Sequence, residues 1–199
     1  YYGSSLGDNQ LFANKHICIT AGIVAFLEAI HLDHIDAFLP TLQEKGLNRD
    51  EFIENIYTLH EQEIVDICND KAVRFSEQCL SNYLLKYDFF DKKLISLSKM
   101  IKACFRSYRE RTISSVNTLL NIFRNETLFN FVEKEIKILW DELSAEKSSV
   151  FFEFIKAFFR INPTATLLIL QNKIEFEEGV ICDWRDIDTE KGKNYQKIT

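Results

Sequence analysis

The chain has 199 residues, of which 46% are hydrophobic, and a formal net charge of −6 at pH 7. This length suffices for one sizeable core or for two smaller cores in series. The chain has only six glycines and two prolines, which favours long helices over a many-stranded β fold.

The five cysteines are scattered along the chain and never form a C-x-x-C pair. This pattern favours free thiols in a reducing compartment over disulfides or a zinc site. The chain opens without a basic-then-apolar signal, and it contains no uninterrupted apolar run of roughly 18 residues. We therefore expect a cytoplasmic protein with no membrane association.

Helical periodicity dominates the first sixty residues. The predicted helices run from about Asn9, from Ile17 to His31, from about Asp33 to Gly46, and from Asn48 to about His60. The helix predicted from Ile17 to His31 has small residues around Gly22, which would let a neighbouring helix pack closely against it. Pro40 should shorten or bend the third, and Asn48 followed by Glu51 resembles a capping box at the start of the fourth.

The period then changes from helical to alternating. Two short runs, 64–67 and 73–75, are rich in β-branched and aromatic residues, and Asn69-Asp70-Lys71 lies between them with turn chemistry. We expect a β-hairpin here, followed by a helix that Ser76 caps. The apolar stripe of that helix is Leu80, Tyr83, Leu84, Tyr87 and Phe90. Helices, hairpin and helix together predict a winged-helix-like domain over 1–90.

The rest of the chain reads as helical. Predicted helices cover Ser96–Arg109, Ile113–Phe123, Glu126–Leu143, Val150–Arg160 and Pro163–Phe176. Short connections between amphipathic helices predict a helical repeat or bundle arm over 91–178. A polar loop or linker should occupy 179–199. The fold class is therefore mostly α, with one small β-hairpin.

Charge is unevenly distributed along the chain. Residues 1–90 hold six Lys and Arg against fourteen Asp and Glu, a net −8, whereas the remainder holds eighteen against sixteen, a net +2. The third winged-helix helix, which reads DNA in transcription factors, should expose Asp50, Glu51, Glu54 and Glu61. Such a surface repels phosphates, so we expect no DNA binding through it.

Two surfaces are candidates for binding. The only basic concentration follows the hairpin region and could contact an acidic partner or a nucleic-acid backbone; a solvated helix face is the competing interpretation. Its members are Lys92, Lys93, Lys99, Lys102, Arg106, Arg109 and Arg111. The second is an aromatic cluster that exceeds one helix face and suggests a protein interface beside core packing. Its members are Phe151, Phe152, Phe158 and Phe159, with Phe154 between them.

Catalytic and metal-binding patterns are weak. No G-x-x-x-x-G-K-[ST] motif is present, so we expect no nucleotide binding by this segment, no cofactor and no metal. His31 and His34 with nearby aspartates could ligate a metal, but two ligands specify little, and a solvated helix end is the preferred interpretation. His60-Glu61 has no nearby Ser or Cys nucleophile, and the carboxylate pairs Glu177-Glu178 and Asp186-Asp188 lie in a polar segment where catalytic geometry is hard to maintain.

One stretch resembles a known family. The run LHEQEIVDICNDKAVRFSEQCLSNYLLKYDFFDKKLISLSKMI is similar to the winged-helix region of bacterial signal-transduction ATPases with numerous domains, the STAND class, which are relatives of NOD-like receptors. In that family a P-loop ATPase core precedes the winged helix, and a histidine of the winged helix sometimes touches the nucleotide phosphates. His16, His31, His34 and His60 are the candidates here, and none lies in a defining motif.

The resemblance implies a regulatory segment without catalytic residues. Its partners would be an upstream ATPase domain, downstream helical repeats, a sensed protein ligand and further copies in a homo-oligomer, in an antiviral defence sensor. The chain starts at Tyr1 without a methionine, so we expect it to be a piece of a larger protein. The alternative is a nucleic-acid-binding winged-helix regulator that uses the basic helix near residues 92–111.

Overall fold

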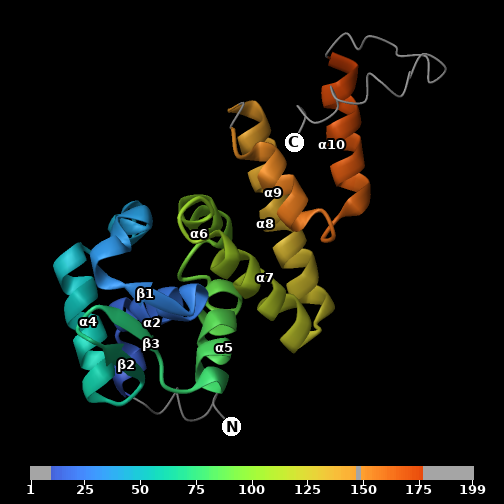
Figure 1. Cartoon of the computed structure of the whole chain (residues 1–199). Coiled ribbons are helices and arrows are strands. Elements are labelled where there is room, and N and C mark those ends of the chain that lie inside the picture. The colour runs from blue at the N-terminus through green and yellow to red at the C-terminus, as the bar shows by residue number, and fades with distance from the viewer. Residues whose placement is uncertain (1–9, 147–148, 177–199) are drawn as a thin grey trace, which may run out of the picture. The chain divides into compact units, whose positions relative to one another are not determined.

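The computed structural model describes residues 10–146 and 149–176, in a compact unit that ends at Phe158 and a second unit that begins at Phe159 (Figure 1). The predicted polar segment 179–199 lies outside the described residues. In the first unit the elements are η1 (Gln10–Ala13), α2 (Lys15–Leu27), β1 (Ala29–His31), η2 (Leu32–Ala37), α3 (Leu39–Gln43), α4 (Arg49–Glu61), β2 (Val65–Cys68), β3 (Ala72–Phe75), α5 (Gln78–Lys86), the π-helix η3 (Tyr87–Asp91), α6 (Leu97–Cys104), α7 (Arg109–Phe123), α8 (Glu126–Ala145) and α9 (Phe151–Phe158). In the second unit α10 covers Pro163–Phe176.

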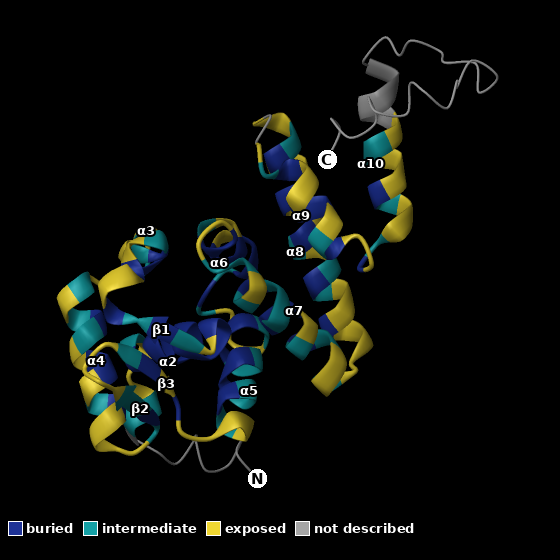
Figure 2. Cartoon of the chain, viewed as in Figure 1, coloured by how far each residue is buried: buried dark blue, intermediate teal, exposed yellow. Residues whose placement is uncertain are grey.

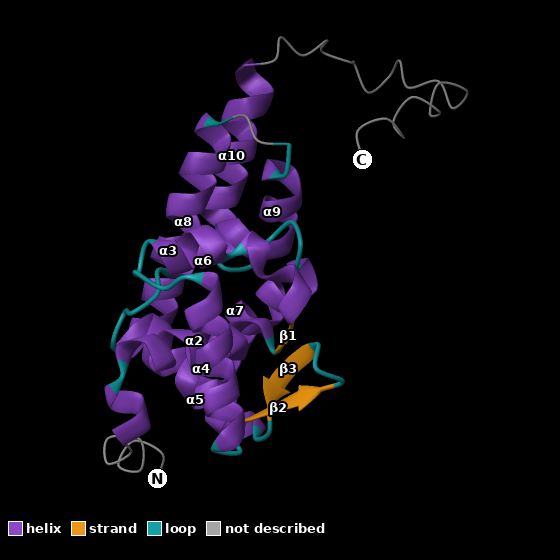
Figure 3. Ribbon diagram, turned by 90° about the vertical axis from the view of Figure 1, so that its left-hand side faces the viewer, coloured by secondary structure: helices purple, strands orange, loops and turns teal. Residues whose placement is uncertain are grey.

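The predicted hairpin is confirmed and carries one strand more than expected. β2 pairs with β3 in antiparallel register, and Asn69 and Asp70 between them adopt φ of 52° and 54°. Positive φ is accessible to Asn and Asp, which explains why this dipeptide makes the turn. β1 pairs with the other side of β3, which gives the order β1-β3-β2 (Figure 3). The helices, the three strands and the helix after them have winged-helix-like topology.

The helix predicted to reach His31 ends earlier. α2 stops at Leu27, and Glu28 follows with φ of 59°, which turns the chain so that Ala29–His31 can join the sheet. Ile30 is buried between its two partly exposed neighbours, the alternation of a half-covered strand. The prediction of helix over 28–31 was therefore wrong.

α2 is the central helix of the first unit. Every residue from Ile17 to Leu27 is buried, and α4, α5 and α7 all pack against it (Figure 2). Its hydrophobic character all round is what a helix enclosed on every side requires. Ser115 of α7 donates a hydrogen bond to the Phe26 carbonyl, and Ser114 donates to the Glu28 carboxylate at 2.6 Å. α7 thereby fixes the end of α2, where the chain turns into β1.

The start of α4 has one of the two hydrogen bonds of the predicted capping box. The Asn48 side chain accepts a hydrogen bond from the Glu51 amide at 2.9 Å, which satisfies one free amide of the first turn. The Glu51 carboxylate does not return to Asn48 but bonds His16 Nδ1 of α2 at 2.5 Å. The arrangement is an N-cap without the reciprocal bond of a capping box.

Substituting the cap should weaken the fold by a modest amount. We expect Asn48→Ala to lower the free energy of unfolding by about 1 kcal/mol, because the Glu51 amide loses its acceptor. Urea denaturation followed by circular dichroism measures this difference. Asn117→Ala, at an exposed position inside α7, is the matched control and should be neutral or slightly stabilising. Equal losses in the two variants would contradict the capping role.

The entry into α5 differs from the prediction. Glu77, not Ser76, is the N-cap residue, and Ser76 Oγ instead donates to Asp66 Oδ1 of the hairpin at 3.0 Å. The buried face of α5 and η3 is also displaced by one residue from the predicted stripe, and two of its residues are polar. The buried residues of α5 and η3 are Ser81, Leu84, Leu85, Asp88 and Phe89. Tyr83, Tyr87 and Phe90 of the predicted stripe are only half-buried.

The helices after η3 continue the same compact unit. α6, α7 and α9 pack around α8, whose buried face is Leu128, Val132, Ile136, Leu139, Trp140 and Leu143. Contacts also join these helices to the first part of the chain, where Tyr108 Oη donates to the His34 carbonyl at 2.7 Å. The division of the chain at Phe90 stays a prediction. In the second unit α10 begins at Pro163, with Asn162 Oδ1 accepting from the Ala165 amide, as expected for the Asn-Pro break.

Candidate functional site

The predicted basic surface is divided among three elements. Lys92 and Lys93 lie in the turn after η3, Lys99 and Lys102 lie on α6, and Arg106 and Arg109 lie at the α6–α7 turn and the first residue of α7. Most of these charges already have an acidic or aromatic neighbour within the unit. The helical spacing seen in the sequence therefore does not place these residues on one helix face.

Three of these cations form ion pairs with residues far away in sequence. Lys99 Nζ lies 2.6 Å from Glu44, and Arg109 Nη1 lies 2.7 Å from Glu153. Lys102 Nζ bonds Glu146 at 2.6 Å and Glu142 at 3.1 Å, and these bonds raise the pKa of Lys102. Much of the positive charge is thus matched inside the protein.

The remaining basic residues have weaker partners. The ammonium groups of Lys92 and Lys93 lie 5.6 Å and 5.7 Å from the ring centroids of Tyr87 and Phe131. Arg106 donates to the hydroxyl of Ser149 at 3.4 Å, and no carboxylate in the described part of the chain forms an ion pair with it.

The aromatic cluster divides between core and surface. Phe151 and Phe158 are only 1% and 2% exposed, and the Phe158 ring packs 5.9 Å from Phe105. These two residues therefore belong to the core and take no part in an outer surface. Phe152 is 61% exposed on α9, and Phe159, in the second unit, is 44% exposed. Only these two of the four predicted interface residues are available to a partner.

The outer face of α4 is acidic, as expected. Asp50, Glu54 and Glu61 are exposed, whereas Glu51 is half-buried against His16. The single arginine of the helix, Arg49, is paired with Asp36 at 3.0 Å. The helix in the position that reads DNA therefore offers carboxylates without free positive charge among its own residues.

The four histidines occupy different places. His16 Nδ1 pairs with Glu51, and His60 Nδ1 contacts the Val65 carbonyl at 2.9 Å, so one ring nitrogen of each histidine already has a partner. His31 and His34 lie together, with ring centroids 4.9 Å apart. Within residues 10–146 and 149–176, no group of three or more His, Cys, Asp or Glu side chains is placed to hold a metal ion.

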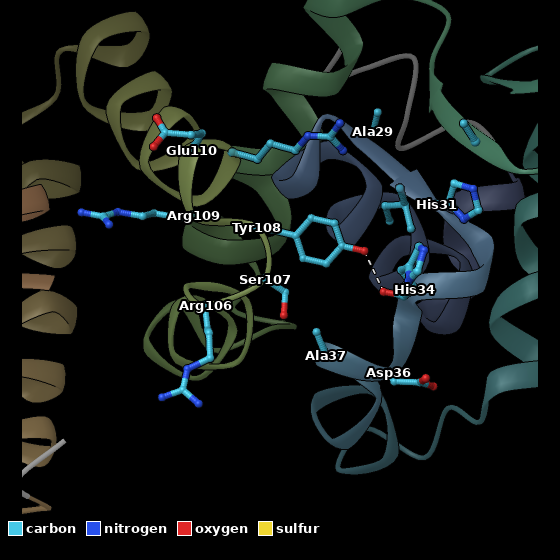
Figure 4. A pocket seen from close by; sticks show the side chains of 13 residues that line it. Ala29, His31, His34, Asp36, Ala37, Arg106, Ser107, Tyr108, Arg109 and Glu110 are labelled. Carbon is cyan, nitrogen blue, oxygen red and sulfur yellow. Dashed lines mark hydrogen bonds between the residues drawn. The ribbon is translucent and has the colours of Figure 1, made fainter. Parts of the chain in front are cut away.

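His31 and His34 line a groove that the sequence did not predict. It has a volume of about 840 Å³ and lies between β1 with η2 on one side and the turn 106–108 with the first residues of α7 on the other (Figure 4). The Tyr108 side chain points across to η2 and bonds the His34 carbonyl. This volume falls within the range of about 300–1,000 Å³ that is typical of ligand sites. No local pattern indicated it, because residues that face each other across it, such as His34 and Tyr108, are 74 positions apart in the sequence.

A buried carboxyl group is the second unforeseen feature. Asp88 of η3 is 0% exposed, and neither of its carboxylate oxygens has a hydrogen-bond partner in the part of the chain that the structure describes. A Cβ built on Gly22 of α2 would lie 2.5 Å from Asp88 Oδ2. Burial raises the pKa of the Asp88 carboxyl well above its ordinary value of 3.8.

The described thiols give no sign of reactivity in the core. Burial raises the pKa of Cys18 and of Cys104 to about 12, so neither forms a thiolate near neutral pH. Cys68 and Cys79 are exposed and free.

In comparisons with family models, with curated proteins and with solved structures, no match to this chain was found. Among the described residues, no helix is long and apolar enough to cross a membrane.

Proposed function

We propose that the chain is a non-catalytic regulatory and scaffold segment of a multidomain signal-transduction ATPase of the STAND type, in a cytoplasmic antiviral sensor. The observation that carries the proposal is a winged-helix-like unit whose α4 presents carboxylates where a DNA-reading helix presents cations. Phosphate neutralisation supplies nearly all non-specific DNA affinity. A winged helix with this charge is suited to meeting protein surfaces.

The packing of the unit supports a role as a rigid block. α2 is enclosed by α4, α5 and α7, and ion pairs such as Lys99–Glu44 link α6 to the first part of the chain. A block of this kind can move as one body against an ATPase domain when the nucleotide changes. In the proposed mechanism it transmits ligand sensing by the helical arm to nucleotide state and oligomerisation.

Nucleic-acid and nucleotide binding provide the first test. We expect the 199-residue chain to give no gel shift with a 30-base-pair duplex at low salt, because Lys99, Lys102 and Arg109 are already paired with carboxylates. Isothermal titration with Mg-ATP should likewise give no binding heat. A shift that weakens steeply with added salt would favour the nucleic-acid regulator instead, and a micromolar ATP signal would refute the non-catalytic assignment.

The coding sequence before Tyr1 provides the second test. The proposal requires an upstream G-x-x-x-x-G-K-[ST] motif that follows a strand and opens a helix. A gene product that lacks any such motif before Tyr1 would overturn the ATPase context while leaving the charge argument intact.

A further inference from the structure

The contact between α2 and η3 holds a carboxyl group out of reach of solvent. Asp88 of η3 is 0% exposed, and neither of its carboxylate oxygens has a hydrogen-bond partner among the described residues. It lies so close to Gly22 of α2 that a Cβ on that glycine would be 2.5 Å from Asp88 Oδ2. A gap that cannot accept a methyl carbon cannot accept a water molecule either. The carboxyl group can therefore be hydrated on this side only if α2 and η3 move apart.

The groups around Asp88 do not offset a negative charge there. Three titratable groups have charges that interact with it, and all are acids whose pKa values are raised: Cys18 of α2, Tyr83 of α5 and Tyr87 of η3. Lys86 of α5 bonds both carboxylate oxygens of Asp91 at 2.7 Å, so this cation already has a partner. An ionised Asp88 in the closed contact would lack both a counter-charge and a hydrogen bond within residues 10–146 and 149–176.

η3 is the side of the contact that can move. α2 is enclosed by α4, α5 and α7, whereas η3 is a five-residue π-helix, a form found often at functional sites. Its closing bond runs from the Lys92 amide to the Tyr87 carbonyl at 2.8 Å, and the Leu94 amide bonds the Asp88 carbonyl at 2.8 Å. Lys93 between these two donors has φ of 52°, a left-handed conformation that is unfavourable for a non-glycine residue.

Two opposing forces act on η3. Phe89 is 0% exposed and packs 5.2 Å from the Phe26 ring of α2, so its burial holds η3 on α2. An ionised Asp88 acts against this packing, because the carboxylate gains hydration only in an open state. Burial raises the pKa of Asp88 well above 3.8 in the closed state. Above pH 3.8 the opening equilibrium therefore shifts tenfold per pH unit toward the open state, until the pH passes the pKa of the closed state.

We propose that the α2–η3 contact is a proton-linked latch, which is closed while Asp88 carries its proton and opens locally when that proton passes to the solvent. In the open state η3 leaves α2 and Asp88 is hydrated, while α2, the sheet and α6 to α9 stay folded. Residues 92–96 lead from η3 directly into α6, so the latch controls the connection between the winged-helix-like part and the helices that follow. It needs only the α2–η3 contact and does not depend on an ATPase domain.

Native-state hydrogen exchange of the full 199-residue chain between pH 4.5 and pH 7 tests the proposal. The reporters are the Lys92 and Leu94 amides, whose acceptors lie in η3, and the reference is the Ile136 amide of α8. After correction for intrinsic exchange, the opening constant of the reporters should rise tenfold per pH unit. Low concentrations of urea should leave it unchanged, because local opening exposes little surface, whereas the opening constant at Ile136 should rise with urea.

Two variants within η3 separate the latch from a general effect of charge. Asp88→Asn should reduce the pH dependence of the reporters to less than twofold per unit. Asp91→Asn, at an exposed position of the same π-helix, should keep the tenfold dependence. An opening constant that does not change with pH in the wild-type chain, or reporters that share the urea dependence of Ile136, would overturn the proposal. The second result would mean that η3 opens only when the whole unit unfolds.

Discussion

Replacing Asp88 by asparagine should stabilise the folded chain at neutral pH, by a margin that grows as the pH rises. Asp88 is completely buried without a hydrogen-bond partner among the described residues, so the folded chain holds its carboxyl protonated. The groups whose charges interact with it, Cys18, Tyr83 and Tyr87, are themselves neutral in the acid and neutral range because their pKa values are raised. Within residues 10–146 and 149–176, no cation is found to compensate an ionised Asp88.

The pH dependence follows from the raised pKa of Asp88 in the folded chain. Below the ordinary value of 3.8, both states are protonated and Asp88→Asn should change stability little. Above it the unfolded chain ionises first, so the wild-type chain loses about 1.4 kcal/mol per pH unit relative to the variant until the pH passes the folded pKa. Urea denaturation of both chains between pH 3 and pH 8 measures the gap.

A matched carboxylate separates this effect from general charge removal. Asp141 is exposed on α8, and Asp141→Asn should stay within about 0.5 kcal/mol of wild type at every pH. Parallel stability curves for wild type and Asp88→Asn would show that the folded chain ionises Asp88, and hence that the carboxyl is hydrated or bonded.

The sequence predicted those elements whose signals are local. The hairpin, the Asn48 cap and the break at Pro163 were each indicated by residues close together in the sequence, and the structure confirms them. β1 could not be predicted in this way, because Ile30 continues the apolar period of α2 and the strand exists only through pairing with β3, forty residues later. Glu28, which breaks the helix, is not a residue type that signals positive φ.

The binding surfaces were harder to predict than the fold. The acidic face of α4 followed directly from helical spacing, whereas the basic concentration did not reveal its ion pairs. Lys99 and Lys102 bond carboxylates 55 and 40 or more positions away, which no window along the chain connects. The groove at β1 depends in turn on a strand that the sequence did not show. Long-range packing therefore decides which charges and which backbone groups are free.

The buried face of α5 and η3 illustrates the same limit. A hydrophobic stripe selects Tyr83 and Tyr87, but Ser81 and Asp88 occupy the core positions one residue away. The small side of α2 did indicate a close neighbour, and the group that lies against Gly22 is the Asp88 carboxyl. The small residues of α2 predicted that some element packs closely against it, but they did not predict which residue that would be.

Gly22→Ala should destabilise the chain by about 2 kcal/mol, although alanine is the better helix former. The new Cβ would lie 2.5 Å from Asp88 Oδ2, 2.9 Å from its Cβ and 3.0 Å from its Cγ, closer than real contacts allow. Overpacking of this kind costs typically about 1–3 kcal/mol, which outweighs a helix-propensity gain of up to about 1 kcal/mol. Thermal or urea unfolding at pH 5 gives the difference.

The sign of the Gly22 effect should reverse when its neighbour is removed. In an Asp88→Gly background all three clashing atoms are absent, so the same Gly22→Ala change should become neutral or stabilising by up to about 1 kcal/mol. Gly46→Ala is the matched control: its φ of +78° makes any side chain there strained, but it has no neighbour within 4 Å. Its cost should be equal in both backgrounds. A Gly22→Ala loss that persists without Asp88 would mean that α2 and η3 are not in the contact described.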